Sequence, residues 1–114
     1  MTNRPEDREM KLAAIPELDT PALVIDLEAM EGNLRRMAEW FAGRACKLRP
    51  HAKTHKCTEV ARRQVKLGAI GITCAKLGEA EAMAHGGIED ILIANQVAGA
   101  LKICLLYTSD AADE

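Results

Sequence analysis

Short apolar runs alternate along the chain with longer segments in which apolar residues recur every three or four positions. The apolar runs predict strands at 22–27, 46–53, 69–75 and 90–96. The periodic segments between them predict helices over 29–41, 59–67 and 78–85. Strands and helices that alternate in this way favour parallel strands joined by right-handed crossovers.

Residues suited to helix ends stand at the expected boundaries. Asp26 or Glu28 is placed to start the first helix, and Gly43 to end it; Thr58 is expected to cap the second helix, and Gly68 to end it. The first helix also carries an apolar stripe, which we interpret as a packing surface rather than a ligand-binding surface: Met30, Leu34, Met37, Trp40 and Phe41.

Two architectures fit this order of elements, a (β/α)8 barrel and a doubly wound open sheet. No strand is followed by the GxGxxG fingerprint of dinucleotide-binding sheets, and a Walker A motif is absent. A complete barrel takes about 250 residues, whereas this chain has 114. We therefore predict an α/β fold: a partial (β/α)8 TIM-type barrel over residues 18–103, truncated to its N-terminal three to four strand–helix units.

Composition narrows the functional classes. The chain is 48% hydrophobic and 28% charged with a formal net charge of −2, which is typical of a soluble globular protein without general attraction to nucleic acid or membranes. Residues 1–17 are too polar for a secretory signal, so we expect an N-terminal arm there. The four cysteines lack CxxC spacing, which disfavours a zinc ribbon and suits reduced thiols in the cytoplasm.

The last eleven residues, 104–114, differ in character from the rest of the chain. A short apolar triplet is followed by a polar, acidic end without periodicity. Reverse-translated, CLLYTS can be written tgtctcttatacacatct, which resembles the transposon-end adapter of sequencing libraries, and DAADE fits the bases that follow in that adapter. We interpret 104–114 as translated adapter and expect the native sequence to end near Ile103; a natural polar tail is the alternative.

Polar and basic residues follow the predicted strands, where sites form in both architectures. The second strand is followed by the lysines Lys53 and Lys56, and the fourth by Asn95 and Gln96. A lysine at a strand end, screened from water and beside other cations, can act as a neutral amine that attacks a carbonyl group. The alternative is a loop of solvated basic residues.

Three segments resemble one known family: TPALVIDLEAMEGNLRRM, then LRPHAKTHK, then GITCAKLGEAEAMAHGGIEDILIANQVA. They are similar to the N-terminal part of the D-threonine aldolase and D-serine dehydratase group, pyridoxal-phosphate enzymes of the alanine-racemase-like fold class. The resemblance implies that Lys53 carries pyridoxal 5'-phosphate covalently and that Lys56 does not. It also makes His51, His55 and Gln96 candidates for cofactor contact, with ordinary packing or loop roles as the alternative.

The resemblance implies a lyase acting on a small D-configured β-hydroxy amino acid, cleaved as by D-threonine aldolase to glycine and an aldehyde. A D-serine dehydratase-like lyase and a non-catalytic pyridoxal-phosphate-binding protein are the alternatives. The family's divalent metal is expected on ligands outside this chain; His51 and His55 would share a face only on a helix, which Pro50 disfavours. We expect the full-length protein to be a homodimer or monomer, and the 114-residue fragment to be inactive.

Overall fold

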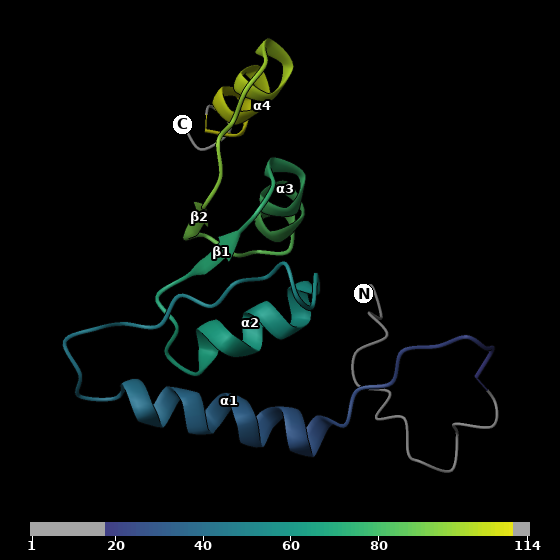
Figure 1. Ribbon diagram of the computed structural model, residues 1–114, viewed down its shortest axis with the longest axis vertical. Coiled ribbons are helices and arrows are strands. Elements are labelled where there is room, and N and C mark those ends of the chain that lie inside the picture. Colours follow the sequence, from purple (N-terminus) through teal and green to yellow (C-terminus); the bar gives the residue numbers. More distant parts are fainter. Residues whose placement is uncertain (1–17, 111–114) are drawn as a thin grey trace, which may run out of the picture.

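The structure is a computed structural model that describes the backbone of residues 18–110 and the side chains of residues 18–107. Four helices and two short strands follow one another along these residues (Figure 1). Their bounds are α1 Leu27–Phe41, α2 Thr58–Lys66, β1 Ile72–Cys74, α3 Leu77–His85, β2 Ile91–Ile93 and α4 Ala100–Asp110. The predicted arm over 1–17 lies outside the described residues.

The strands form a small parallel sheet with β1 at its centre. Strand β1 pairs with β2, with Ile72 opposite Ile91. On its other side lies the extended segment 48–51, joined to β1 by a parallel bridge between His51 and Thr73 and by a 2.8 Å bond from Thr73 N to the Pro50 carbonyl oxygen. The parallel order that the sequence predicts is therefore present, with α2 and α3 as the connections.

A small core lies between this sheet and its two connecting helices. It is built from Ala52, Ala61, Ile72, Cys74, Ala80, Met83 and Ile88, with Ile91 and Ile93 packed against it. Three of these residues are alanines, one in the turn after segment 48–51, one in α2 and one in α3. The core thereby fixes the positions at which segment 48–51 and β1 end.

The predicted strand at 22–27 is wrong. Residues 22–26 are extended without strand pairing, and the side chains of Leu23 and Val24 are 102% and 56% exposed. A strand needs a neighbour for its backbone hydrogen bonds, and no described segment lies beside this one (Figure 1). Helix α1 begins at Leu27 instead, with Asp26 as its N-cap accepting a 2.9 Å hydrogen bond from Ala29 N.

The predicted second strand is also shorter than expected. Only 48–51 runs beside β1, because residues 52–55 fold into a turn. The expected cap at Thr58 is wrong as well: Thr58 is the first residue of α2, and the N-cap Cys57 makes no side-chain cap. The predicted helix ends are confirmed, since Gly43 and Gly68 follow α1 and α2 with φ of 74° and 105°.

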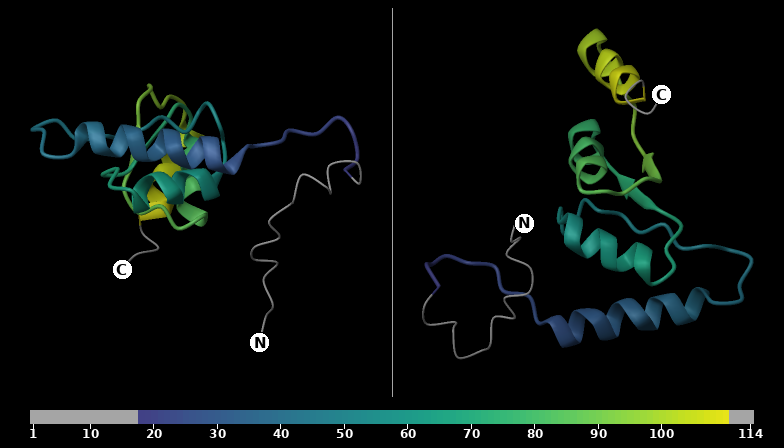
Figure 2. Two further views of the ribbon diagram at one scale, coloured as in Figure 1. Left: turned by 90° about the horizontal axis from the view of Figure 1, so that it is seen from below. Right: turned by 180° about the vertical axis from the view of Figure 1, so that it is seen from behind.

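Helix α1 lies at the periphery, with α2 between it and the sheet (Figure 2). It has no buried residue, and its predicted packing stripe is half-exposed: Trp40 is 55% accessible and is covered in part by the Arg44 guanidinium, 4.0 Å from the ring centroid. The expected boundary at 103 falls inside α4. Among the described residues, no helix has the length and apolar character needed to cross a membrane.

Candidate functional site

The predicted site residues come together at one edge of the sheet. Because the strands are parallel, segment 48–51, β1 and β2 all end at this edge. The turn 52–55 follows the first of them directly and carries Lys53, whose side chain is exposed. It ends at Lys56, which has a positive φ of 48°. The candidate site is therefore a lysine-bearing turn on the rim of the sheet.

Hydrogen bonds within the turn fix its backbone. Lys53 N donates to His51 Nδ1 at 3.3 Å, and Thr54 Oγ1 donates to the His51 carbonyl oxygen at 3.3 Å. Lys56 N donates to the Ala52 carbonyl oxygen at 2.8 Å, which closes the turn. None of these bonds uses the Lys53 amine, and no ion pair within the described residues occupies it. The amine is thus available to a ligand.

Backbone hydrogen bonds hold His51, just before the turn, and His55, within it, in the same tautomer. His55 Nδ1 accepts a 3.1 Å hydrogen bond from Cys57 N, as His51 Nδ1 does from Lys53 N. In the neutral ring the proton then lies on Nε2 in both cases. His55 Nε2 is buried and has no hydrogen-bond partner among the described residues. A buried donor of this kind lacks an acceptor, and a ligand oxygen would supply one.

Glu79, which sequence reasoning did not single out, also lies at this edge. Its side chain is only 15% exposed; Oε2 accepts a 2.9 Å hydrogen bond from Ala75 N, and Oε1 lies 3.9 Å from Lys56 Nζ. The Ala75 hydrogen bond, chiefly, and the charge of Lys56 hold the pKa of Glu79 below its usual range. The carboxylate is therefore ionised at neutral pH.

Asn95 and Gln96 follow β2 at the same edge. Asn95 Nδ2 donates to the Ala75 carbonyl oxygen at 3.2 Å, and Asn95 Oδ1 accepts from Gln96 N at 2.9 Å. The first of these bonds ties the end of β2 to the end of β1, and the second is local to the segment after β2. Gln96 is exposed and separated from the lysine-bearing turn by β1, so its contact with a cofactor stays a prediction.

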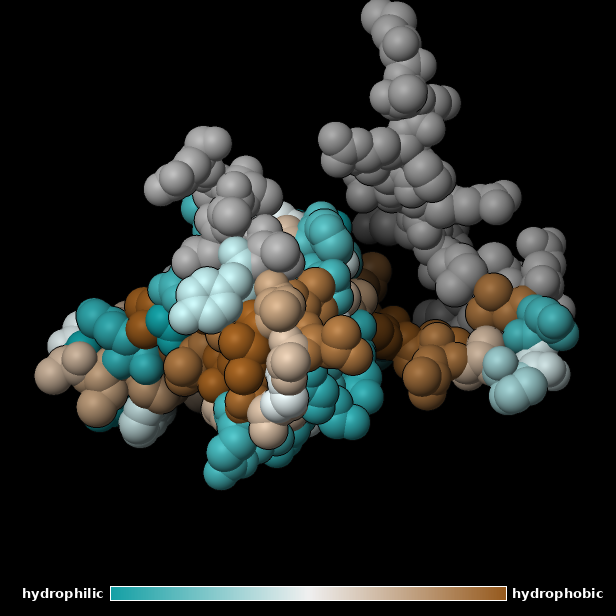
Figure 3. All heavy atoms as spheres, turned by 90° about the horizontal axis from the view of Figure 1, so that it is seen from above, coloured by the Kyte–Doolittle hydropathy of each residue, from teal (hydrophilic) through white to brown (hydrophobic). Residues whose placement is uncertain are grey.

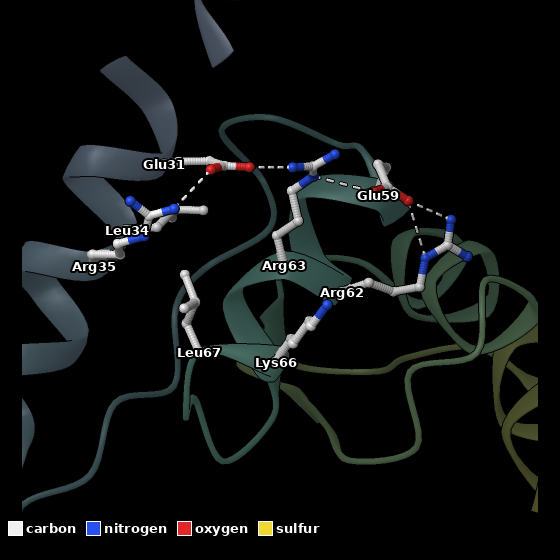
Figure 4. A pocket seen from close by; sticks show the side chains of 8 residues that line it. All are labelled: Glu31, Leu34, Arg35, Glu59, Arg62, Arg63, Lys66 and Leu67. Carbon is white, nitrogen blue, oxygen red and sulfur yellow. Dashed lines mark hydrogen bonds and ion pairs between the residues drawn. The ribbon is translucent and has the colours of Figure 1, made fainter. Parts of the chain in front are cut away.

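A separate hollow of about 340 Å³ lies between α1 and α2 (Figure 4). Most of the residues that line it form ion pairs. Glu31 pairs with Arg35 and Arg63, and Glu59 pairs with Arg62 and Arg63. It contains none of the predicted site residues. In the part of the chain that the structure describes, no group of three His, Cys, Asp or Glu side chains is arranged to hold a metal.

Comparison with known proteins identifies the fold to which these elements belong. The profile of the alanine racemase N-terminal domain matches residues 25–107. The chain belongs to this family. The family has a TIM-barrel-like fold, so the predicted fold class is confirmed, and the described elements are strand–helix units of such a barrel. The match extends into 104–107, and the interpretation of 104–114 as translated adapter stays a prediction.

Curated relatives of the chain are enzymes of D-configured hydroxy amino acids. D-threonine aldolase from Arthrobacter sp. is 50% identical over 92 residues, covering 81% of this chain and 24% of the relative. 3-hydroxy-D-aspartate aldolase from Paracoccus denitrificans is 42% identical over 88 residues, covering 76% and 23%. The chain thus spans about a quarter of the length of these relatives.

Solved structures of such enzymes resemble this chain in both sequence and fold. D-threonine aldolase from Filomicrobium marinum superposes with a TM-score of 0.74 at 50% identity, covering 77% of this chain and 24% of that one. D-threo-3-hydroxyaspartate dehydratase from Delftia sp. HT23 superposes with a TM-score of 0.72 at 42% identity, covering 82% and 25%. Both the local sequence and the arrangement of elements are therefore those of this enzyme group.

Proposed function

We propose that the full-length protein carrying this chain is a pyridoxal-phosphate-dependent lyase that cleaves small D-β-hydroxy amino acids, as D-threonine aldolase does, to glycine and an aldehyde. The observation that carries the proposal is the placement of Lys53. Its exposed amine, which has no partner among the described residues, stands in a closed turn at the strand-end rim, where barrel enzymes place their catalytic groups. Identity of 50% to an aldolase supports the reaction type.

The residues of the rim fit pyridoxal phosphate. Lys53 would hold it covalently, and His51, His55 and Gln96 would contact it. The cofactor is anionic and rich in oxygen, and His55 Nε2 is a buried donor without an acceptor among the described residues. When bound, the cofactor supplies an electron sink for the bond broken at the substrate Cα. A divalent metal is expected on ligands outside this chain; one related dehydratase structure is described as metal-free.

The chain's own contribution is to hold the backbone of the lysine in place. The Ala52–Lys56 hydrogen bond and the two bonds to His51 order the backbone on both sides of Lys53. Lys56, also exposed, adds positive charge beside it. This arrangement leaves the Lys53 amine on an ordered backbone, near a cation that favours an anionic cofactor. We place the protein in the cytoplasm, as a homodimer or monomer.

Lys53→Ala and Lys56→Gln in the full-length protein form a matched pair that tests the assignment. Each variant is saturated with pyridoxal phosphate, reduced with borohydride and mapped by peptide mass spectrometry. We expect wild type and Lys56→Gln to carry the cofactor on residue 53. Lys53→Ala should lose the covalent attachment, and its lyase activity should fall by at least about a hundredfold. Attachment retained by Lys53→Ala would contradict the proposal.

A dehydratase reaction is the second candidate, because D-threo-3-hydroxyaspartate dehydratase from Delftia sp. is 47% identical over 81 residues. A dehydratase removes the Cα proton and the β-hydroxyl group, for which the freed Lys53 amine is a candidate proton carrier. Product analysis separates the reactions: glycine and an aldehyde indicate the aldolase, and a keto acid with ammonia indicates a dehydratase, including a D-serine dehydratase-like one. Cofactor binding without either product indicates a carrier protein.

A further inference from the structure

The lysine-bearing turn is tied to the sheet at its beginning by the backbone. Ala52 N donates a 2.8 Å hydrogen bond to the Thr73 carbonyl oxygen of β1, and Ala52 is 1% exposed. The bonds that follow, around Lys53 and Thr54, stay inside the segment 51–56. The far end of the turn leads into α2, which begins at Thr58, and a side-chain contact at Lys56 is a further anchor for it.

Glu79 is placed to be that anchor. It stands in the first turn of α3, just beyond the end of β1 (Figure 1). One carboxylate oxygen is fixed by Ala75 N at the end of β1, and the other faces Lys56 Nζ at 3.9 Å. Lys56 itself is in the left-handed region with φ of 48°, a conformation that a non-glycine residue keeps only when its surroundings favour it.

We infer that Glu79 is a positioning residue for the cofactor-bearing lysine. It holds Lys56, and through Lys56 the closed turn that presents Lys53, against the end of β1. This inference rests on the proposed function, because it assigns the turn a ligand. The proposed role of Glu79 is to position the turn and not to take part in the reaction, because Glu79 contacts Lys56 and Ala75 and not the Lys53 amine.

Helix capping is the competing explanation for Glu79. The residue is the third of α3, where a glutamate accepts hydrogen bonds from the backbone preceding the helix. A cap stabilises α3 but does not act through Lys56. The two roles therefore differ in what a substitution at Lys56 does to the turn itself: it speeds exchange of the Lys56 amide if Glu79 positions the turn, and leaves that exchange unchanged if Glu79 only caps.

A double-mutant cycle in the full-length protein tests the inference. Glu79→Gln keeps an acceptor for Ala75 N but loses the charge, and Lys56→Gln leaves the Ala75 bond intact. Glu81→Gln, on the same helix and exposed, is the matched control. The measurements are the Kd for pyridoxal phosphate, the hydrogen-exchange rate of the Lys56 amide in the cofactor-free protein, and the Tm.

We expect Glu79→Gln and Lys56→Gln each to raise the Kd and to speed Lys56 amide exchange by about two- to five-fold, the size of effect of a partly exposed ion pair. The double variant should match either single variant, and Glu81→Gln should match wild type. Independent, multiplying effects, or wild-type behaviour of Lys56→Gln, would overturn the inference. A different outcome would contradict only the proposed function: the wild-type protein binds no pyridoxal phosphate, while Glu79→Gln and Lys56→Gln still speed exchange of the Lys56 amide as expected.

Discussion

Single residues at the opposite edge of the sheet, where the strands begin, serve stability rather than chemistry. Arg49 and Asp90 form a two-pronged ion pair there, with nitrogen–oxygen distances of 2.7 and 2.9 Å. The pair connects the chain just before His51 to the residue before β2, and so joins the two outer strand segments across β1. In barrel proteins this amino-terminal edge is associated with folding, whereas the other edge is associated with catalysis.

Asp90→Asn in the full-length protein should lower the Tm at neutral pH, by an amount that shrinks as the pH falls into the acid range. The hydrogen bond from Arg49, chiefly, holds the pKa of Asp90 below its usual value. A lowered folded-state pKa contributes stability that is fully present above the unfolded-state value, about 3.9, and is lost as the pH falls through the folded-state value. Thermal unfolding of both proteins in a pH series from neutral to below the unfolded-state value measures how the Tm difference shrinks.

Glu89→Gln, at the exposed neighbouring position, is the control for that series and should follow wild type throughout. A Tm difference between Asp90→Asn and wild type that stays constant down to the acid end of the series would show that the ion pair is not its cause. The proposed lyase activity should be unchanged by either substitution at neutral pH and at temperatures below unfolding, because neither residue reaches the strand-end rim.

The part of the candidate site whose residues are neighbours in the sequence could be predicted. The part that depends on a residue distant in the sequence could not. Lys53, His51 and His55 are close together in the chain, and the structure places them in and beside one turn. Glu79 comes from the next connection, in an alanine-rich helix with no unusual spacing. Its only sequence signal is a glutamate three positions after the helix N-cap, a position that usually indicates a cap.

At the scale of elements, Gly71 permits the close approach of the strands. It precedes β1 with φ of 155°, and a Cβ atom there would overlap the Arg49 guanidinium and the Asp90 carbonyl oxygen and lie 2.9 Å from Asp90 Cβ. We expect Gly71→Ala to destabilise the full-length protein by about 1–3 kcal/mol. Chemical denaturation monitored by circular dichroism measures the change.

Gly32 provides the matched comparison. It lies inside α1 without a positive φ, and a Cβ atom added there would have no neighbouring atom within 4 Å. Because alanine favours helix over glycine, Gly32→Ala should stabilise the protein by about 0.5–1 kcal/mol. If Gly71→Ala left stability unchanged or raised it as Gly32→Ala does, the steric account of Gly71 would be wrong.

Helices were more predictable than strands in this chain, for a physical reason. A helix satisfies its backbone within one segment, so its spacing and end residues define it, as Asp26 and Gly43 do for α1. A strand depends on a neighbour. Segment 22–26 has the apolar, β-branched composition of a strand but no described partner, and stays unpaired. The run 69–75, lying between two partners, forms β1 at its centre.

Across the whole molecule, apolar side chains are exposed far from the small core. Figure 3, viewed with α4 toward the reader, shows apolar groups gathered over that helix; Leu101 and Tyr107 are 88% and 73% accessible. Leu23, at the other end of the described chain, is fully exposed, and Trp40 is half-exposed. Apolar side chains that gather on one exposed face, as they do over α4 (Figure 3), favour association between molecules.

We therefore expect the 114-residue chain, expressed alone, to be aggregated or to lack fixed packing. Within the described residues, the outer edges of the small sheet have no strand beside them and are open to other chains, and the buried core consists of few side chains, mostly small. Size-exclusion chromatography, near-ultraviolet circular dichroism and dye binding to exposed apolar surface measure this, with the full-length protein as the folded control. A soluble monomer with a sharp, cooperative thermal transition would contradict the prediction, because its small core and open edges would then suffice for a unique fold.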